Sequence, residues 1–167
     1  MKLGLISDTH GNLPRTREAL DLLRREGIHQ LVHCGDLGSE AVLNLLLEVR
    51  ESGIPVIAVH GNVDEWDTDL ILYAKHLHIP LPRVARFTAD GHACAVHHGH
   101  DRLVMHALQA EPDLDMLFTG HTHVPADEPL GHLRIINPGA VHRAATPMVS
   151  TLHLSTGRLQ RHAISRE

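Results

Sequence analysis

The first sixty residues alternate between short apolar runs and longer segments whose apolar residues recur at helical spacing. Strands are predicted over residues 2–7, 30–34 and 55–60. Helices are predicted over residues 13–26 and from Ser39 to near Gly53, because each segment is followed by a glycine where a helix would stop. Alternating strands and helices indicate βαβ units, so we expect these three strands to share a largely parallel sheet.

The second half of the chain has a different pattern, with short strands mostly separated by turns that contain glycine or proline. One helix is predicted over residues 102–109, and residues 89–92 and 155–158 are typical of hairpin turns. The predicted strands cover 83–89, 92–98, 114–119, 133–137, 148–154 and 159–164. A length of 167 residues favours one domain. We therefore expect a single α/β domain over residues 1–167, with two packed sheets forming a β-sandwich flanked by helices.

The charge balance and the cysteines exclude several classes of protein. A formal charge of −5 and only four Phe, Trp and Tyr residues provide neither a basic surface nor stacking platforms, so we expect no non-specific nucleic-acid binding. The apolar run at the start is too short for a signal peptide or a membrane span, and we expect a cytoplasmic protein without membrane contact. Cys34 and Cys94 lack CxxC spacing and are predicted to be free, buried thiols.

Side chains that can bind metal ions follow five of the predicted strands, usually next to a glycine. The chain has 17 histidines, but this excess is not informative by itself, because it accompanies a compositional preference for Arg over Lys. Position is informative, since the carboxyl ends of strands in an open α/β sheet converge on one crevice. The residues at these strand ends are Asp8 and His10, Asp36, Asn62, His98, and His121 and His123.

Carboxylate, imidazole and amide ligands without thiolate suit divalent ions such as Mn, Fe and Zn. Asp36 has two oxygens and can bridge two ions, while pairs spaced like Asp8 and His10 can hold one ion from a strand end and the turn after it. Two cations about 4 Å apart can clamp a phosphate and lower the pKa of a water molecule between them. The sequence therefore predicts a two-metal centre at which a metal-activated water or hydroxide hydrolyses phosphate esters.

The same residues form motifs of a known family. Asp8-x-His10, Gly35-Asp36, Gly61-Asn62, His98-Gly99-His100 and Gly120-His121-x-His123 occur in the order that they have in calcineurin-like metallophosphoesterases. The chain resembles this family from residue 3 to about 142, and resembles most its small bacterial and archaeal phosphodiesterases, through Gly-Asn-x-Asp and Asn137-Pro138-Gly139. The resemblance implies a four-layer fold of two mixed β-sheets between helices, and a small phosphodiester as substrate.

The resemblance also implies a ligand set and a cofactor. The first metal would be held by Asp8, His10 and His123, the second by Asn62, His98 and His121, and both by Asp36. Asp36, Asn62 and His98 would then act in catalysis through the metals. The family implies two divalent ions, with Mn expected and Fe, Zn or Ni as alternatives.

Two departures from the family pattern bear on the reaction. Many members have His after the metal-binding Asn, where it protonates the leaving group, but this chain has Val63. The general acid is therefore unassigned, with His100 and Asp64 as weak candidates. Leu37 follows Asp36, in place of the Asp-Arg-Gly series of Ser/Thr protein phosphatases, so a protein substrate is not expected.

Other interpretations of the same residues lead to different expectations. A catalytically inactive scaffold with this fold, like the related sorting subunit of the retromer coat, is the main alternative; complete metal ligands favour an enzyme. A regulatory metal sensor is a further alternative, although no effector segment is evident. The apolar residues in 66–77 indicate a cover for the site or a homo-oligomer contact.

Neighbouring histidines need separate interpretations. The His-Gly-His spacing favours His98 over His97 as the ligand, because adjacent strand residues face opposite sides. His33 and His60 are interpreted as core groups or outer partners of ligands. His142 is expected in a solvated loop, with contact to substrate phosphate as the alternative.

Overall fold

The computed structural model describes residues 1–165 and contains two five-stranded sheets. The first sheet has the order β10 (Arg158–Ala163), β9 (Met148–His153), β1 (Lys2–Ile6), β2 (Gln30–His33) and β3 (Val56–Ala58). The second has the order β4 (Ala85–Ala89), β5 (His92–Val96), β6 (Met116–Phe118), β8 (Leu133–Asn137) and β7 (Ala126–Leu130). Both sheets are mixed, with parallel strands β1-β2-β3 and β5-β6-β8 and antiparallel strands outside them.

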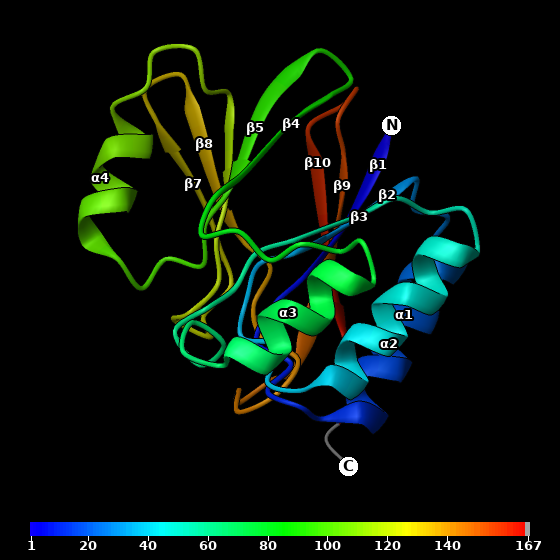
Figure 1. The fold of residues 1–167 in the computed structure, drawn as a ribbon. Helices are drawn as coiled ribbons and strands as arrows, with labels where there is room; N and C mark the ends of the chain where they lie inside the picture. Colours follow the sequence, from blue (N-terminus) through cyan, green and yellow to red (C-terminus); the bar gives the residue numbers. More distant parts are fainter. Residues whose placement is uncertain (166–167) are drawn as a thin grey trace.

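Helices lie on the outer face of each sheet, as Figure 1 shows. The first sheet is covered by α1 (Leu13–Arg25), α2 (Glu40–Glu51) and α3 (Thr68–His76), and the second by α4 (Arg102–Gln109). Side-chain caps fix the helix starts: Asn12 accepts from the Arg15 N–H at α1, and Ser39 accepts from the Val42 N–H at α2. The chain is thus layered helix, sheet, sheet, helix.

Three apolar clusters separate these four layers. Leu23 and Leu46 belong to the cluster between the helices and the first sheet. Val32 and Phe118 belong to the cluster between the two sheets, and Leu117 belongs to the one beneath α4. Phe118 and Leu117 are adjacent in β6 but face opposite sides, as side chains alternate along a strand. The predicted sandwich of mixed sheets flanked by helices is confirmed.

Two elements correct the sequence-based prediction. No helix is predicted from the sequence over residues 65–82, but they contain α3, which buries Leu70 and Ala74 in the core. Strand β7 was not predicted, because its sequence Ala-Asp-Glu-Pro-Leu is mostly exposed and pairs only with β8 at the edge of the sheet. None of the helices in residues 1–165 is long and apolar enough to cross a membrane.

Candidate metal centre

Backbone hydrogen bonds continue beyond the strands of the first sheet and align the turns that carry the predicted ligands. The Asp8 N–H donates to the Gly35 carbonyl at 3.0 Å, and the His10 N–H donates to the Asp36 carbonyl at 3.0 Å. In the second sheet, the Gly120 N–H donates to the His98 carbonyl at 2.9 Å. The His121 N–H then donates to Oδ2 of Asp8 at 3.2 Å, which joins the two sheets at this edge.

The predicted ligands have an unusual backbone conformation. Eight non-glycine residues among the described part of the chain have a positive φ, and five of these are predicted ligands. Those five are Asp8, His10, Asp36, His121 and His123. Sharp turns of this kind reverse the chain at once after each strand and direct the side chains into the space between the strand ends.

Within residues 1–165, two groups of three side chains have ligand atoms that lie within 4.8 Å of one another. The first group is Asp8, His10 and His123, in which the two Nε2 atoms lie 3.2 Å apart and His123 Nε2 lies 3.2 Å from Asp8 Oδ1. The second group is Asp8, Asp36 and His98, in which His98 Nε2 lies 3.3 Å from Asp36 Oδ1. Asp8 is fully buried and belongs to both groups.

The Asp36 carboxylate belongs to the second group and also faces His10 of the first. Its Oδ1 faces His98, while its Oδ2 lies 3.7 Å from His10 Nε2. Burial by itself would raise the pKa of Asp36, but the imidazoles of His98 and His10 and the Val63 N–H hold it at about 2. The carboxylate is therefore ionised at neutral pH, with one oxygen directed to each group.

Unpartnered polar atoms inside the protein indicate that a cation fits between these side chains. Asp8 Oδ1 and His98 Nε2 are buried and have no hydrogen-bond partner among residues 1–165, although they lie 3.8 Å apart. Buried polar atoms without a partner are costly in free energy and are uncommon in native proteins. Two carboxylates and three imidazoles form a partly anionic set of oxygen and nitrogen donors, which suits a divalent metal ion.

Carbonyl groups fix the orientation of two of the imidazoles. His98 Nδ1 lies 2.8 Å from the Cys34 carbonyl, and His123 Nδ1 lies 3.1 Å from the Arg143 carbonyl. A carbonyl only accepts, so each Nδ1 carries the hydrogen and each Nε2 presents its lone pair to the cluster. Such outer partners are usual for metal-binding histidines. The sequence did not indicate them, because a carbonyl partner leaves no trace in residue identity.

His121 and Asn62 lie at the exposed edge of the cluster. The His121 ring centroid is 5.3 Å from that of His98. The turn of Asn62 contacts Asp36, since the Val63 N–H donates to Asp36 Oδ1 at 3.0 Å. The His121 side chain therefore lies next to His98 but belongs to neither group, and the backbone that follows Asn62 contacts Asp36.

The two candidates for the general acid have different surroundings. Asp64 is fully buried and accepts from the N–H groups of Leu37, Gly38 and Gly61 at 2.8 to 3.0 Å. Asp64 therefore acts as a clamp, in that its carboxylate joins the turn of Leu37 and Gly38 to the turn of Gly61, and it is not placed to donate a proton to substrate. The His100 ring centroid lies 5.5 Å from that of His98, and neither His100 nitrogen has a hydrogen-bond partner in the described part of the chain.

The remaining histidines near the cluster have separate roles. His33 is buried, with Nε2 3.1 Å from the Thr9 hydroxyl and Nδ1 accepting from the Gly35 N–H, so its interpretation as a satisfied core group is confirmed. His97 is buried and stacks on His100. His142 Nδ1 lies 3.2 Å from the Asn12 side-chain nitrogen, which ties its loop to the start of α1.

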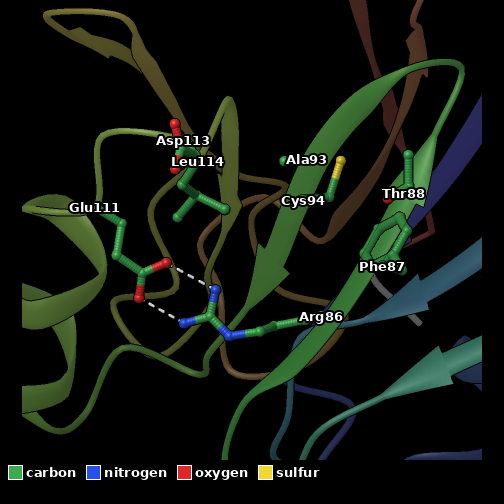
Figure 2. A pocket seen from close by; sticks show the side chains of 8 residues that line it. All are labelled: Arg86, Phe87, Thr88, Ala93, Cys94, Glu111, Asp113 and Leu114. Carbon is green, nitrogen blue, oxygen red and sulfur yellow. Dashed lines mark hydrogen bonds and ion pairs between the residues drawn. The ribbon is translucent and has the colours of Figure 1, made fainter.

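A separate hollow of about 400 Å³ lies at the opposite end of the second sheet (Figure 2). Arg86 from β4 spans part of it to Glu111, with Nη1 2.7 Å from Oε2. Its other lining residues include Ala93 and Leu114, which lie at the starts of strands whose far ends carry His98 and His121. This hollow is therefore remote from the candidate metal centre. Cys94 also lines it and, like Cys34, is a buried free thiol, as predicted.

Comparison with known proteins agrees with this geometry. The chain is 29% identical to the phosphodiesterase MJ0936 of Methanocaldococcus jannaschii over 141 residues, with 83% of each chain covered. It is 34% identical to the phosphodiesterase YfcE of Escherichia coli over 155 residues, with 84% of this chain and 79% of YfcE covered.

Among solved structures, that of a novel archaeal phosphodiesterase matches with a TM-score of 0.85 and 26% identity, over 98% of this chain and all of the other. The model of the calcineurin-like phosphoesterase superfamily domain matches residues 1–157. This match covers every strand except β10 and every side chain of the two ligand groups. The chain therefore belongs to the calcineurin-like phosphoesterase superfamily.

Proposed function

We propose that this protein is a metal-dependent phosphodiesterase with a two-metal centre. The observation that carries the proposal is the position of Asp36, whose two oxygens face His98 at 3.3 Å and His10 at 3.7 Å. A carboxylate directed to two groups of ligands is suited to bridge two ions. The names of the relatives support phosphodiesters as the substrate class.

Each predicted ligand has a place in this proposal. Asp8, His10 and His123 would hold the first ion, Asn62, His98 and His121 would hold the second, and Asp36 would contact both. The ions, when bound, supply positive charge that lowers the pKa of a water molecule and neutralises charge on the phosphate oxygens. The Cys34 and Arg143 carbonyls keep the imidazoles of His98 and His123 in the required tautomer.

The leaving group needs a proton, and His100 is the candidate that the surroundings favour. Its ring lies beside His98 and, unlike Asp64, is not engaged with backbone N–H groups.

Mn is the proposed metal, with Fe, Zn or Ni as alternatives. The two free thiols support a cytoplasmic location, where thiols stay reduced. Exposed Trp66 supports a homo-oligomer, which size-exclusion chromatography with light scattering would test.

The test is hydrolysis of bis-p-nitrophenyl phosphate by metal-stripped protein, with and without added Mn. We expect turnover only with the metal and a loss of at least about 100-fold in Asp36→Asn, since even loss of an outer partner of a metal ligand typically costs 10–100-fold. Asp69→Asn is the matched control, because Asp69 is an exposed acid on α3. Its rate should equal that of the wild type.

Metal binding, measured by calorimetry, distinguishes the possible failures. Protein that binds Mn but hydrolyses no phosphodiester with any of the four metals would support the inactive scaffold. Equal rates with and without chelator would contradict the metal centre itself.

A further inference from the structure

A hollow of about 350 Å³ lies between α3 and the chain segment that follows it. It is lined by His60, Glu65, Ile71, Lys75, Pro80, Leu81 and Pro82, and we refer to it as the α3 hollow. Its walls are joined, because the His60 N–H donates to the Pro82 carbonyl at 3.2 Å. Ile71 and Lys75 lie one turn apart on α3 and therefore face the same side.

The α3 hollow adjoins the metal-ligand cluster through His100. Two of its lining residues contact this histidine: Glu65 Oε2 lies 3.8 Å from His100 Nε2, and the ring centroids of His60 and His100 are 6.4 Å apart. His100 in turn lies beside His98. One side chain, His100, thus lies between the hollow and the proposed metal ligand His98.

The lining combines an apolar floor with a few polar groups. Leu81 is buried and Ile71 is half-buried, whereas an imidazole, a carboxylate and an ammonium group from His60, Glu65 and Lys75 lie around them. Small-molecule sites typically have this composition, with apolar surface for contact area and few polar groups for orientation. A neutral ring with hydrogen-bonding groups at its edge matches such a lining, and the volume lies within the range of small-molecule sites.

We propose that the α3 hollow binds one ester group of the substrate and selects phosphodiesters in which that group is a nucleoside or a ring of similar size and polarity. This inference rests on the proposed phosphodiesterase function and adds the substrate class. It also assigns α3 a functional role, because this helix supplies the wall that contains Ile71 and Lys75.

The test compares two substrates that release the same p-nitrophenol. Thymidine 5′-p-nitrophenyl phosphate has a nucleoside as its second ester group, and methyl p-nitrophenyl phosphate has only a methyl group. We expect the wild type to prefer the nucleoside ester by about tenfold or more in kcat/KM, the low end of the discrimination that one pocket provides. Lys75→Trp, which fills the hollow from its exposed edge, should bring the ratio of the two kcat/KM values close to one.

Leu72→Trp is the matched control, because Leu72 is exposed on the same helix but does not line the hollow. This variant should keep the wild-type ratio. Equal kcat/KM for the two esters in the wild type would overturn the inference, and so would a Lys75→Trp variant that keeps the preference.

Binding of thymidine to metal-free protein, followed by saturation-transfer NMR, tests the hollow without turnover. We expect a signal with the wild type and Leu72→Trp that is lost in Lys75→Trp. Should no variant hydrolyse either ester, the proposed function fails while this binding result still decides the role of the hollow. A thymidine signal unchanged by Lys75→Trp, or absent from the wild type, would overturn the proposed site.

Discussion

Asp and His serve two purposes at the strand ends of this protein. Their side chains bind metal ions, and both residue types tolerate the left-handed conformation better than most non-glycine residues do. Asp8, Asp36 and His121 have φ values of 55°, 57° and 69°. Strain of this kind persists only where surrounding contacts fix the backbone, and it concentrates at functional sites. The same Asp and His residues thus form the turns and supply the predicted metal-binding atoms.

The position of these turns could be predicted from the sequence. Which ligand atom faces which neighbouring side chain could not. Asp8 and Asp36 follow buried strands beside glycines or polar turn residues, a pattern visible in the residues alone. Which oxygen faces which imidazole depends on side-chain torsions and on packing across two sheets. The contacts of Asp36 Oδ1 and Oδ2, and the contact of His123 with the Arg143 carbonyl, therefore could not be predicted from the sequence.

Gly61 provides a test of how closely the backbone packs around Asp36. A Cβ at this position would lie 2.0 Å from Asp36 Oδ1 and 2.6 Å from the Asp36 backbone nitrogen. We expect Gly61→Ala to displace the carboxylate and weaken Mn binding, with a loss of about 1–3 kcal/mol in the free energy of unfolding, as is typical of overpacking. Calorimetric titration with Mn and urea unfolding would measure the two effects.

Gly27→Ala is the control for this prediction. Gly27 has a φ of 69°, but a Cβ at this position would meet open space, so alanine there costs only the strain of the left-handed conformation, roughly 1–2 kcal/mol. Mn affinity should stay at the wild-type value in this variant. Unchanged Mn affinity in Gly61→Ala would show that the Asp36 carboxylate is not sterically fixed.

His33 makes the stability of the metal-free protein depend on pH. Burial lowers the pKa of His33 to about 3, so the folded protein keeps it neutral. Below the ordinary pKa of about 6.5, the unfolded chain binds a proton that the folded chain does not. His33 therefore stabilises the folded state fully above pH 6.5 and loses roughly 1.4 kcal/mol per pH unit as the pH falls towards 3.

We expect His33→Gln to lose less stability than the wild type between pH 7 and pH 4.5, although its absolute stability at pH 7 is lower because buried hydrogen bonds change. Urea unfolding of metal-free protein at both pH values would measure the difference. His76→Gln, an exposed substitution, should retain the wild-type dependence. Parallel losses in wild type and His33→Gln would contradict the buried neutral state.

At the scale of elements, the turn after β3 links the first sheet to the predicted ligand Asn62 and to helix α3. It begins at Gly61, carries Asn62, and leads into α3 through Asp67, whose side chain caps the helix by accepting from the Leu70 N–H. The cap and the helically spaced Leu70 and Ala74 were signals from which α3 could have been predicted. Strand β7 offered no such signal, since Pro129 and two acids occupy its centre.

Asp64 and Asp67 lie in this one turn and predict different consequences of substitution. Asp64→Ala removes the acceptor for three N–H groups from two turns, and each unpartnered buried donor typically costs 1–3 kcal/mol. We expect a loss of more than about 3 kcal/mol in unfolding free energy and weaker Mn binding, because both turns carry predicted ligands. Urea unfolding and Mn titration would test this.

Asp67→Ala removes only the helix cap and should cost about 1 kcal/mol. Its Mn affinity should equal that of the wild type. If the two variants proved equally stable, or if Asp64→Ala bound Mn normally, the clamp would not be what positions the turns.

At the scale of the whole molecule, the metal centre lies where the two sheets meet. Asp8, His10 and Asp36 follow strands of the first sheet, whereas His98 and His123 follow strands of the second. The apolar cluster between the sheets is a second link, with Val32 and Cys34 from one side and Val96 and Phe118 from the other. We therefore expect the chain to unfold as one cooperative unit and the metal to stabilise that unit.

Thermal unfolding with and without Mn tests both expectations. A ligand that binds only the folded state at 100 times its Kd stabilises by about 2.7 kcal/mol, so the midpoint should rise with Mn concentration in one transition. The rise should be much smaller in His10→Ala and in His98→Ala, one from each sheet, and unchanged in His76→Ala, which alters an exposed residue on α3. For each variant, the increase in unfolding midpoint caused by Mn is compared, and not the midpoint itself. The stability that a variant loses with its buried ring is present with and without Mn, so it does not enter this comparison. Two separate transitions would show that the sheets belong to independent domains, and a full rise in His98→Ala would show that the second sheet contributes no ligand through that residue.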